Sequence, residues 1–364
     1  MTKALEKEKI TLDSGGEAEA QAPVIVSASR STDIPAFYAD WFFERLKRGY
    51  SAWTNPFNGV TSYVSYRNTL FIDFWSKNPR PLLNHLDYLK EKNIGCYIQY
   101  TLNDYEEEGL EKGVPPLSQR IETFKLLVDK LGKGRVIWRF DPLILTDKIS
   151  IDDLLEKVRN IGGQLRAFTE KLVFSFADID SYRKVKTNLE KIGINYTDWD
   201  ENLMNEFASK LSNMNRERKW DFHLATCGEK IDLEQYGIEH NHCVDDNLII
   251  RLAYHDKELM DFLNVEIKHI QPSAPSLFEE FDDTPKIPAD AIMLTPELYA
   301  IKKRNNKDKG QRQFCGCITS KDIGQYNTCP HQCEYCYANT SKSAAVANWK
   351  QHQINPFKDT IIGR

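Results

Sequence analysis

Short runs of apolar, β-branched and aromatic residues alternate with longer amphipathic stretches between residues 23 and 226. This alternation is typical of successive strand–helix units. It predicts strands over residues 24–28, 70–75, 96–101, 136–140, 172–176 and 221–226. Helices are predicted to separate and follow them, over residues 37–48, 81–91, 117–131, 151–160, 182–192 and 201–211.

Six strand–helix units without an internal repeat favour an α/β fold built as a TIM-like parallel (β/α) barrel or partial barrel. A doubly wound sheet is the alternative. No G-x-G-x-x-G sequence follows the first strand, so a dinucleotide-binding fold lacks its fingerprint. We therefore expect residues 23–268 to form a barrel domain.

The two ends of the chain depart from this pattern. Residues 1–22 are polar and predict an N-terminal extension with at most a short hairpin around Ile10. Residues 269–364 begin with an irregular crossing segment, rich in proline and acidic residues, and should complete the barrel. Helices are predicted here over residues 296–303 and 341–351, and another just before this segment over residues 256–263.

Charge and hydropathy exclude several classes of protein. The 48 basic and 53 acidic residues nearly balance, so no global positive field indicates nucleic acid or an anionic membrane as a partner. We find no apolar run long enough to span a bilayer and no secretory signal, and we expect a cytoplasmic protein. The one concentrated basic run, residues 302–312, is either a solvated face or a contact for an anionic substrate or nucleic acid.

Polar residues follow each predicted strand, where the active mouth of a parallel barrel is built. Ser31, Asn78 and Asp178 have an ordinary explanation as turn residues or helix caps. Arg139 and Asp141 alternate with apolar neighbours, so both should project to one face near the mouth. Such a buried pair is either structural or functional. The other polar residues assigned to the mouth are Arg30, Asp33, Lys77, Gln99, Thr101, Ser175, His223 and Thr226.

Three cysteines lie within eight residues near the end of the chain, in the pattern C-x3-C-x2-C formed by Cys329, Cys333 and Cys336. Such clustering is hard to explain by packing. Three thiolates on a four-iron, four-sulfur (4Fe–4S) cluster leave one iron open to a substrate or cofactor. The alternative is a zinc knuckle, but structural zinc sites usually pair C-x2-4-C with a distant second pair.

Five further cysteines remain. Cys96 falls inside a predicted strand and should be a core residue. The other four could complete an all-thiolate second site for an auxiliary iron–sulfur cluster or a structural zinc, with His240 or His242 as an alternative ligand. These four are Cys227, Cys243, Cys315 and Cys317.

Several stretches resemble an uncharacterised bacterial family labelled as a domain of unknown function. The matching segments are residues 24–38, 74–79, 136–143 and 315–329. The three-cysteine motif, with the aromatic Tyr335 before its last cysteine, resembles that of radical S-adenosylmethionine enzymes. The ending Tyr335-Cys336-Tyr337-Ala338 also looks like the spore photoproduct lyase group, which suggests nucleic-acid repair or modification as a subclass.

This resemblance implies that the three thiolates bind a 4Fe–4S cluster whose open iron chelates S-adenosylmethionine. One electron, from a donor such as flavodoxin or ferredoxin, then yields a 5′-deoxyadenosyl radical that abstracts hydrogen from a substrate. The motif usually follows the first barrel strand, so its late position implies circular permutation. No Gly-Gly-Glu segment follows the second strand, because Gly15-Gly16-Glu17 precedes the first.

Under this hypothesis, the chemistry of the substrate is assigned to the charged residues at the mouth, and contacts with S-adenosylmethionine to its polar and aromatic residues. The alternative is a non-catalytic iron–sulfur or zinc-binding protein. The residues assigned to substrate are Arg30, Asp33, Lys77, Arg139 and Asp141, and those assigned to the cofactor are Asn78, Gln99 and Tyr335.

Overall fold

The computed structural model describes residues 6–55, 58–270 and 287–364. Its centre is an eight-stranded sheet in the order β13-β12-β10-β8-β7-β6-β3-β17, and every neighbouring pair is parallel. All six predicted strands are present in it. The strands are β3 (Ile25–Ala28), β6 (Phe71–Ser76), β7 (Gly95–Thr101), β8 (Val136–Leu143), β10 (Lys171–Phe176), β12 (His223–Thr226), β13 (Ile238–His240) and β17 (Lys321–Asp322).

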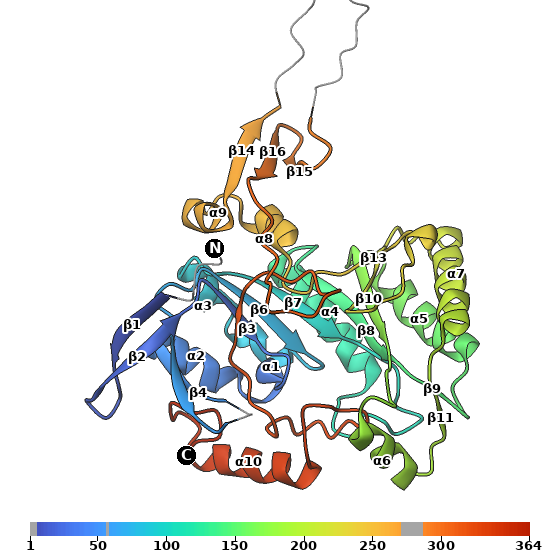
Figure 1. Ribbon diagram of the computed structural model, residues 1–364, viewed down its shortest axis with the longest axis horizontal. Coiled ribbons are helices and arrows are strands. Elements are labelled where there is room, and N and C mark those ends of the chain that lie inside the picture. Colours follow the sequence, from blue (N-terminus) through green and yellow to red (C-terminus); the bar gives the residue numbers. More distant parts are fainter. Residues whose placement is uncertain (1–5, 56–57, 271–286) are drawn as a thin grey trace, which may run out of the picture.

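The sheet is open, because β13 and β17 form its two edges in the described part of the chain. The parallel sheet was correctly predicted, but a closed barrel is not formed. The short β17 comes from the C-terminal segment and pairs with β3, with Lys321 opposite Val26 and Asp322 opposite Ser27. The last part of the chain therefore lies beside its first sheet strand (Figure 1).

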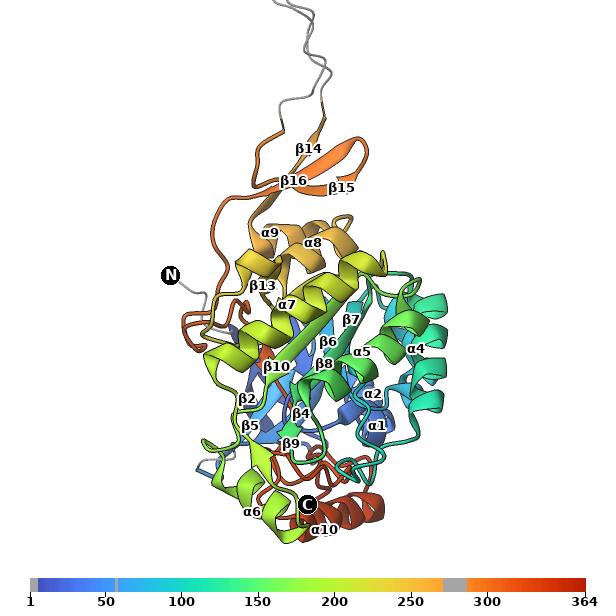
Figure 2. The ribbon, with the colours of Figure 1, turned by 90° about the vertical axis from the view of Figure 1, so that its right-hand side faces the viewer.

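Alternate residues of each strand face two different cores. On the outer side, Val26, Phe74 and Trp138 pack with the helices that connect the strands. Figure 2 shows α4, α5 and α7 along this side. The helices are α1 (Ile34–Phe37), α2 (Ala39–Arg48), α3 (Leu86–Glu91), α4 (Leu117–Leu131), α5 (Ile151–Leu165), α6 (Arg183–Lys191) and α7 (Glu201–Glu217), with short 3-10 turns at Arg80–Asn84 and Glu234–Tyr236.

The inner side of the sheet is filled by later parts of the chain. Ile25, Phe71 and Tyr97 pack there against α8 (Asp246–Ala253) and α9 (Lys257–Leu263), at the edge where the strands begin. Cys243 and Cys317 belong to the same core. The inner face is thus covered by chain rather than enclosed by further strands.

Two smaller sheets flank the central one. The N-terminal hairpin predicted around Ile10 is present, but it extends into a four-stranded sheet in the order β1-β2-β5-β4. Beyond α9, three antiparallel strands form a second small sheet, and the helix predicted over residues 296–303 is wrong because β16 pairs there with β14. These strands are β1 (Glu6–Thr11), β2 (Glu17–Ala22), β4 (Tyr50–Thr54), β5 (Thr61–Ser65), β14 (Val265–His269), β15 (Ile292–Thr295) and β16 (Leu298–Lys302), with a separate short pair of β9 (Leu145–Thr146) and β11 (Tyr196–Thr197).

The chain ends with α10 (Lys342–Ile354), as predicted from the sequence. Ser341 caps it by accepting a hydrogen bond from the backbone of Ala344 at 2.9 Å. None of the helices in the described ranges is long and apolar enough to cross a membrane. The predicted proline-rich and acidic segment around Pro272, Pro275 and Glu279 lies outside the described residues.

Candidate metal and cofactor site

The three-cysteine loop lies between β17 and α10, over the ends of three central strands. The loops after β3, β6 and β7 each hold it through one side chain: Asp33 contacts His331, while Lys77 and Asn103 contact Tyr335. Figure 1 shows this C-terminal segment in red along the lower edge of the sheet. The carboxyl ends of parallel strands are where such sheets bind ligands.

The three thiols lie close enough to influence one another. Cys333 is buried, and Cys329 and Cys336 are half-buried. Burial raises the pKa of Cys329 to about 12, and burial also raises the pKa of Cys333 well above its ordinary value. In both cases the neighbouring thiols add to the increase.

Asp33 and His331 anchor the loop. Asp33 is buried, and its Oδ1 atom accepts a hydrogen bond from Ser76 Oγ at 2.6 Å. Its Oδ2 atom accepts from the Lys77 backbone at 2.7 Å and lies 2.8 Å from His331 Nε2. The Nδ1 atom of the same ring lies 2.9 Å from the Gly113 carbonyl oxygen. Because a carbonyl oxygen only accepts, Nδ1 donates to Gly113, and Nε2 faces the Asp33 carboxylate.

The electrostatics around Asp33 favour its ionised form. Burial opposes ionisation of Asp33, but the hydrogen bond and charge of His331 outweigh it, so the pKa of Asp33 lies below its ordinary value. Asp33 also caps α1 by accepting a hydrogen bond from Ala36 at 3.0 Å. All of its contacts are internal, which makes Asp33 a positioning residue for the cysteine loop.

Lys77 and Tyr335, both half-buried, form a second network with the buried Glu111. Lys77 Nζ lies 2.7 Å from Glu111 and 2.9 Å from the Tyr335 hydroxyl, which in turn donates to Glu111. Asn103 donates to the same hydroxyl at 3.1 Å. Burial raises the pKa of Glu111 by itself, but Lys77 and then Arg120 lower it overall. The network keeps one lysine charge close to Cys333.

Arg139 and Asp141 lie together on the inner face, as their alternation predicted. Arg139 is 1% exposed and donates to Asp141, to Gln99 at 3.2 Å and to the Cys243 sulfur at 3.3 Å. Asp141 also accepts a hydrogen bond from Ser175. Gln99 donates to the Cys243 carbonyl at 2.6 Å. This group therefore contacts the second set of cysteines rather than the three-cysteine loop.

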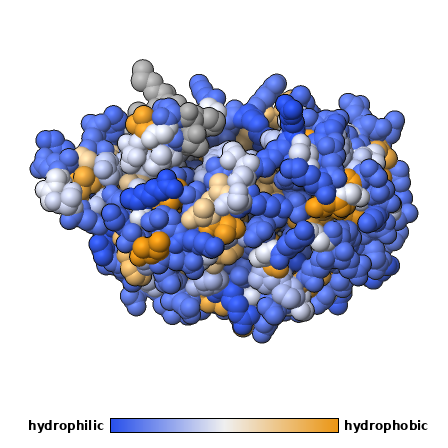
Figure 3. All heavy atoms as spheres, turned by 90° about the horizontal axis from the view of Figure 1, so that it is seen from below, coloured by the Kyte–Doolittle hydropathy of each residue, from blue (hydrophilic) through white to orange (hydrophobic). Residues whose placement is uncertain are grey.

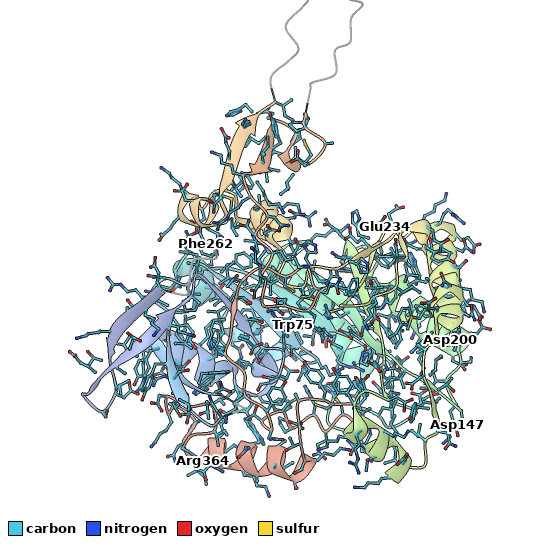
Figure 4. All side chains as sticks on the ribbon, viewed as in Figure 1. Trp75, Asp147, Asp200, Glu234, Phe262 and Arg364 are labelled. Atoms are coloured by element: carbon cyan, nitrogen blue, oxygen red, sulfur yellow. The ribbon has the colours of Figure 1, made fainter. Side chains whose placement is uncertain are left out.

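Arg30 and Trp75 connect the two sets of cysteines. The guanidinium groups of Arg30 and Arg139 lie 5.9 and 4.8 Å from the Trp75 ring centre. The Arg30 backbone donates to Asp322 of β17 at 3.0 Å, and its carbonyl accepts from Tyr337 at 3.2 Å. Figure 4 labels Trp75 in the middle of the molecule.

One residue predicted at the mouth lies elsewhere. His223 was placed at the mouth by its position in the predicted strand, but β12 begins at His223, so this exposed side chain lies at the opposite edge. Asn78 is half-buried, and its backbone donates to Ser76 in a turn. Cys96 is a buried strand residue, as predicted.

The basic run divides between two places. Lys302 binds Asp246 of α8 at 3.1 Å, and Arg304 and Lys307 line a cavity of about 600 Å³ at the edge where β3 and β6 begin. Gln311 reaches the other side and accepts from Arg30 at 3.3 Å. The most basic part of the run, with Lys302, Arg304 and Lys307, therefore faces away from the three-cysteine loop.

Glu111, Asn103 and His331 were not identified from sequence. Glu111 and Asn103 lie on the loop between β7 and α4, which has no regular pattern that would single out one acidic or amide group. His331 stands inside the cysteine motif, two residues from Cys329 and Cys333. That position was the only available signal.

Comparison with known proteins assigns a family but no activity. A family model described as "Domain of unknown function (DUF1848)" matches residues 25–338. The search of curated proteins found no match, and neither did the search of solved structures. The match extends from β3 through the three-cysteine motif, so both parts of the site lie inside it.

Proposed function

We propose that this chain, which belongs to the DUF1848 family, is a radical S-adenosylmethionine enzyme. The observation that carries the proposal is the position of the three thiols at the carboxyl ends of β3, β6 and β7. There the C-terminal segment forms its own strand–loop–helix unit, from β17 through the cysteines to α10. Because β17 pairs in parallel with β3, this unit takes the place of a first strand and helix, which supports a circularly permuted partial barrel.

The sequence pattern of the thiols favours a cluster over a single zinc ion. Structural zinc sites usually pair two ligands spaced as C-x2-4-C with a distant second pair, whereas Cys329, Cys333 and Cys336 form one run of three thiols. Three thiolates fit a 4Fe–4S cluster with one iron left open for a cofactor.

A cluster held by these thiolates would bind S-adenosylmethionine at its open iron and supply the electron that cleaves the sulfonium to methionine and a 5′-deoxyadenosyl radical. The residues around it have separate tasks. Asp33 and His331 hold the loop against β3, and the half-buried Lys77 cation balances thiolate charge beside Cys333. Tyr335 is held by three polar partners and closes the space beneath the loop.

The surface over the loop suits a polar or solvent-borne reaction partner. Tyr337 is 52% exposed directly after Cys336, and Tyr182 of the chain before α6 lies against it with ring centres 6.1 Å apart. Figure 3 shows the face seen from this side as mostly hydrophilic with separate hydrophobic spots. We assign this face to the approach of an electron donor such as flavodoxin or ferredoxin. The substrate is a small molecule or a macromolecule.

The test is anaerobic reconstitution of the full chain with iron and sulfide, followed by reduction with dithionite in the presence of S-adenosylmethionine. We expect the reconstituted protein to lose about four irons per chain when Cys329, Cys333 and Cys336 are all replaced by serine. The 5′-deoxyadenosine detected by mass spectrometry should disappear with them. The Cys96→Ser variant is the matched control, since Cys96 is buried in β7 away from the three-cysteine loop.

A non-catalytic metal protein is the alternative, and the same measurement separates the two. One zinc per chain at the three-cysteine loop, or a reconstituted cluster that releases no 5′-deoxyadenosine, would refute the enzymatic proposal. Nucleic-acid repair has little support, because Lys302, Arg304 and Lys307 lie at the other edge of the sheet.

A further inference from the structure

Four cysteines from three separate segments meet on the inner face of the sheet. Cys227 follows β12, Cys243 lies between β13 and α8, and Cys315 and Cys317 precede β17. The sulfurs of Cys227 and Cys243 are 3.3 Å apart. The thiol of Cys317 is close enough to those of Cys243 and Cys315 to affect the pKa of each. The four thiols therefore form one continuous group, which we call the inner cysteine group.

Hydrogen-bond donors converge on these sulfurs. Arg139 Nη1 lies 3.3 Å and Asn241 Nδ2 lies 3.2 Å from the Cys243 sulfur, and the Val244 backbone lies 3.4 Å from the Cys317 sulfur. Neutral thiols are weak acceptors and have no need of a buried guanidinium. A buried thiolate, in contrast, is stabilised by N–H donors such as these, because a buried anion without hydrogen bonds costs much free energy.

Arg139 itself indicates an anion at this place. It is 1% exposed, and its Nε atom has no hydrogen-bond partner. Arg30 lies on the same side, and its Nε atom is also buried without a partner. Asp141 pairs with Arg139 directly, while Arg30 lies near Asp322 and, beyond it, near the thiols of Cys317 and Cys243. A negatively charged metal–thiolate centre would balance the remainder.

The Cys315-Gly316-Cys317 turn is built for close packing. A side chain at Gly316 would overlap the imidazole ring of His242, so glycine is required there. His242 lies near Asp245 and Asp246, but Asp246 already binds Lys302 and Asp245 caps α8. The two carboxylates therefore already have partners, whereas the four sulfurs are soft ligands that could bind a metal ion here.

We propose that Cys227, Cys243, Cys315 and Cys317 hold a second metal centre, bound by four thiolates and distinct from the three-cysteine site. Two thiolates on one metal ion lie about 3.8 Å apart for a bond length of about 2.3 Å. The 3.3 Å pair of Cys227 and Cys243 is close to that geometry. The centre is either a zinc ion that binds all four thiolates or a two-iron, two-sulfur cluster that binds two thiolates on each iron. Four protein ligands leave no open position, so this centre has a structural or electron-transfer role.

The experiment measures metal in a chain that has lost the first site. The variant with Cys329, Cys333 and Cys336 replaced by serine is purified anaerobically, and zinc, iron and sulfide are counted per chain. We expect about one zinc, or about two irons with two sulfides, to remain. Adding Cys243→Ser should reduce that content at least tenfold, whereas adding Cys96→Ser should leave it unchanged. Zinc and iron readings distinguish the two kinds of centre.

A second measurement uses the unmodified chain, in case the multiple variants do not fold. The half-buried Cys315 is treated with an alkylating reagent before and after a strong chelator is added. Protection that is lost with the metal supports the centre. Free alkylation of Cys315 in protein that lacks zinc and iron, or a Cys227–Cys243 disulfide found by peptide mapping, would overturn the proposal. Neither readout depends on cleavage of S-adenosylmethionine, so the proposed function can fail while this centre stands.

Discussion

The Nε2 atom of His331 lies 2.8 Å from the Oδ2 atom of Asp33, although the two residues are 298 positions apart in sequence. The contact joins the first strand–helix loop to the middle of the three-cysteine motif. Both side chains are buried, and both ring nitrogens of His331 lie within hydrogen-bond distance of an oxygen atom. Removal of the Asp33 charge would leave the buried His331 ring without its carboxylate partner.

Asp33→Asn should therefore destabilise the fold by about 3–5 kcal/mol, the usual cost of breaking a buried ion pair. Chemical denaturation measures the change. Iron bound after reconstitution should fall in parallel, because the loop loses its attachment to β3.

Asp40→Asn is the matched control, since Asp40 also pairs with a histidine, His85, at 2.9 Å. Its side chain is 84% exposed, so we expect a change below about 1 kcal/mol. Equal effects of the two substitutions would contradict the role given to Asp33.

Lys77→Met tests the network beneath Tyr335. The substitution keeps most of the side-chain volume but leaves Glu111 and the Tyr335 hydroxyl without the lysine charge. We expect a loss of about 3–5 kcal/mol in unfolding free energy, since Glu111 is buried. Lys130→Met, which removes a lysine from the exposed pair with Asp87, should cost less than about 1 kcal/mol.

Gly113→Ala should loosen the cysteine loop by steric overlap. A Cβ atom at Gly113 would lie 2.6 Å from the His331 carbonyl oxygen, which is backbone and has little room to move. We expect a loss of about 1–3 kcal/mol in thermal or chemical unfolding. Gly163→Ala has open space in α5 and should instead stabilise the protein by about 0.5–1 kcal/mol.

The docking of α10 should weaken in acid. His352 is buried between Tyr38 and Trp349, and its Nδ1 atom donates to the Ile361 carbonyl at 2.8 Å. Burial lowers the pKa of His352 below its ordinary value of 6.5, and this hydrogen bond only partly opposes the shift. The unfolded chain binds the proton more readily, so stability is present above pH 6.5 and is lost as the pH falls below it.

His352→Gln, which does not titrate, should flatten this decline in unfolding free energy between pH 8 and pH 5. Urea denaturation across this range provides the measurement. An unchanged slope in the variant would show that other groups cause the acid sensitivity.

The central strands could be predicted because each is a short apolar run bounded by turn residues. The alternation of residues along a strand also predicted which side chains share one face of the sheet, as Arg139 and Asp141 do. The strand β16 was mistaken for a helix, because a five-residue apolar run carries no clear period and its pairing with β14 decided the structure. The strands β4 and β5 were missed for the same reason.

The site was predictable only where chemistry concentrates in sequence. Three cysteines in eight residues stand out, whereas Glu111 is one acidic residue among several on an irregular loop. His223 was misplaced because the strand boundary was set two residues too early. The four inner cysteines were grouped by counting, and their closeness depends on how three distant segments cross the sheet.

The pairing of β17 with β3 has a consequence for biosynthesis. Until the ribosome has added the residues around Lys321, the outer hydrogen-bonding edge of β3 has no partner strand. A nascent chain thus has an unpaired strand edge for most of its synthesis, and unpaired edges promote association between molecules. Binding of a chaperone or delayed folding of β3 would reduce the risk of aggregation. A chain terminated before β17 should aggregate.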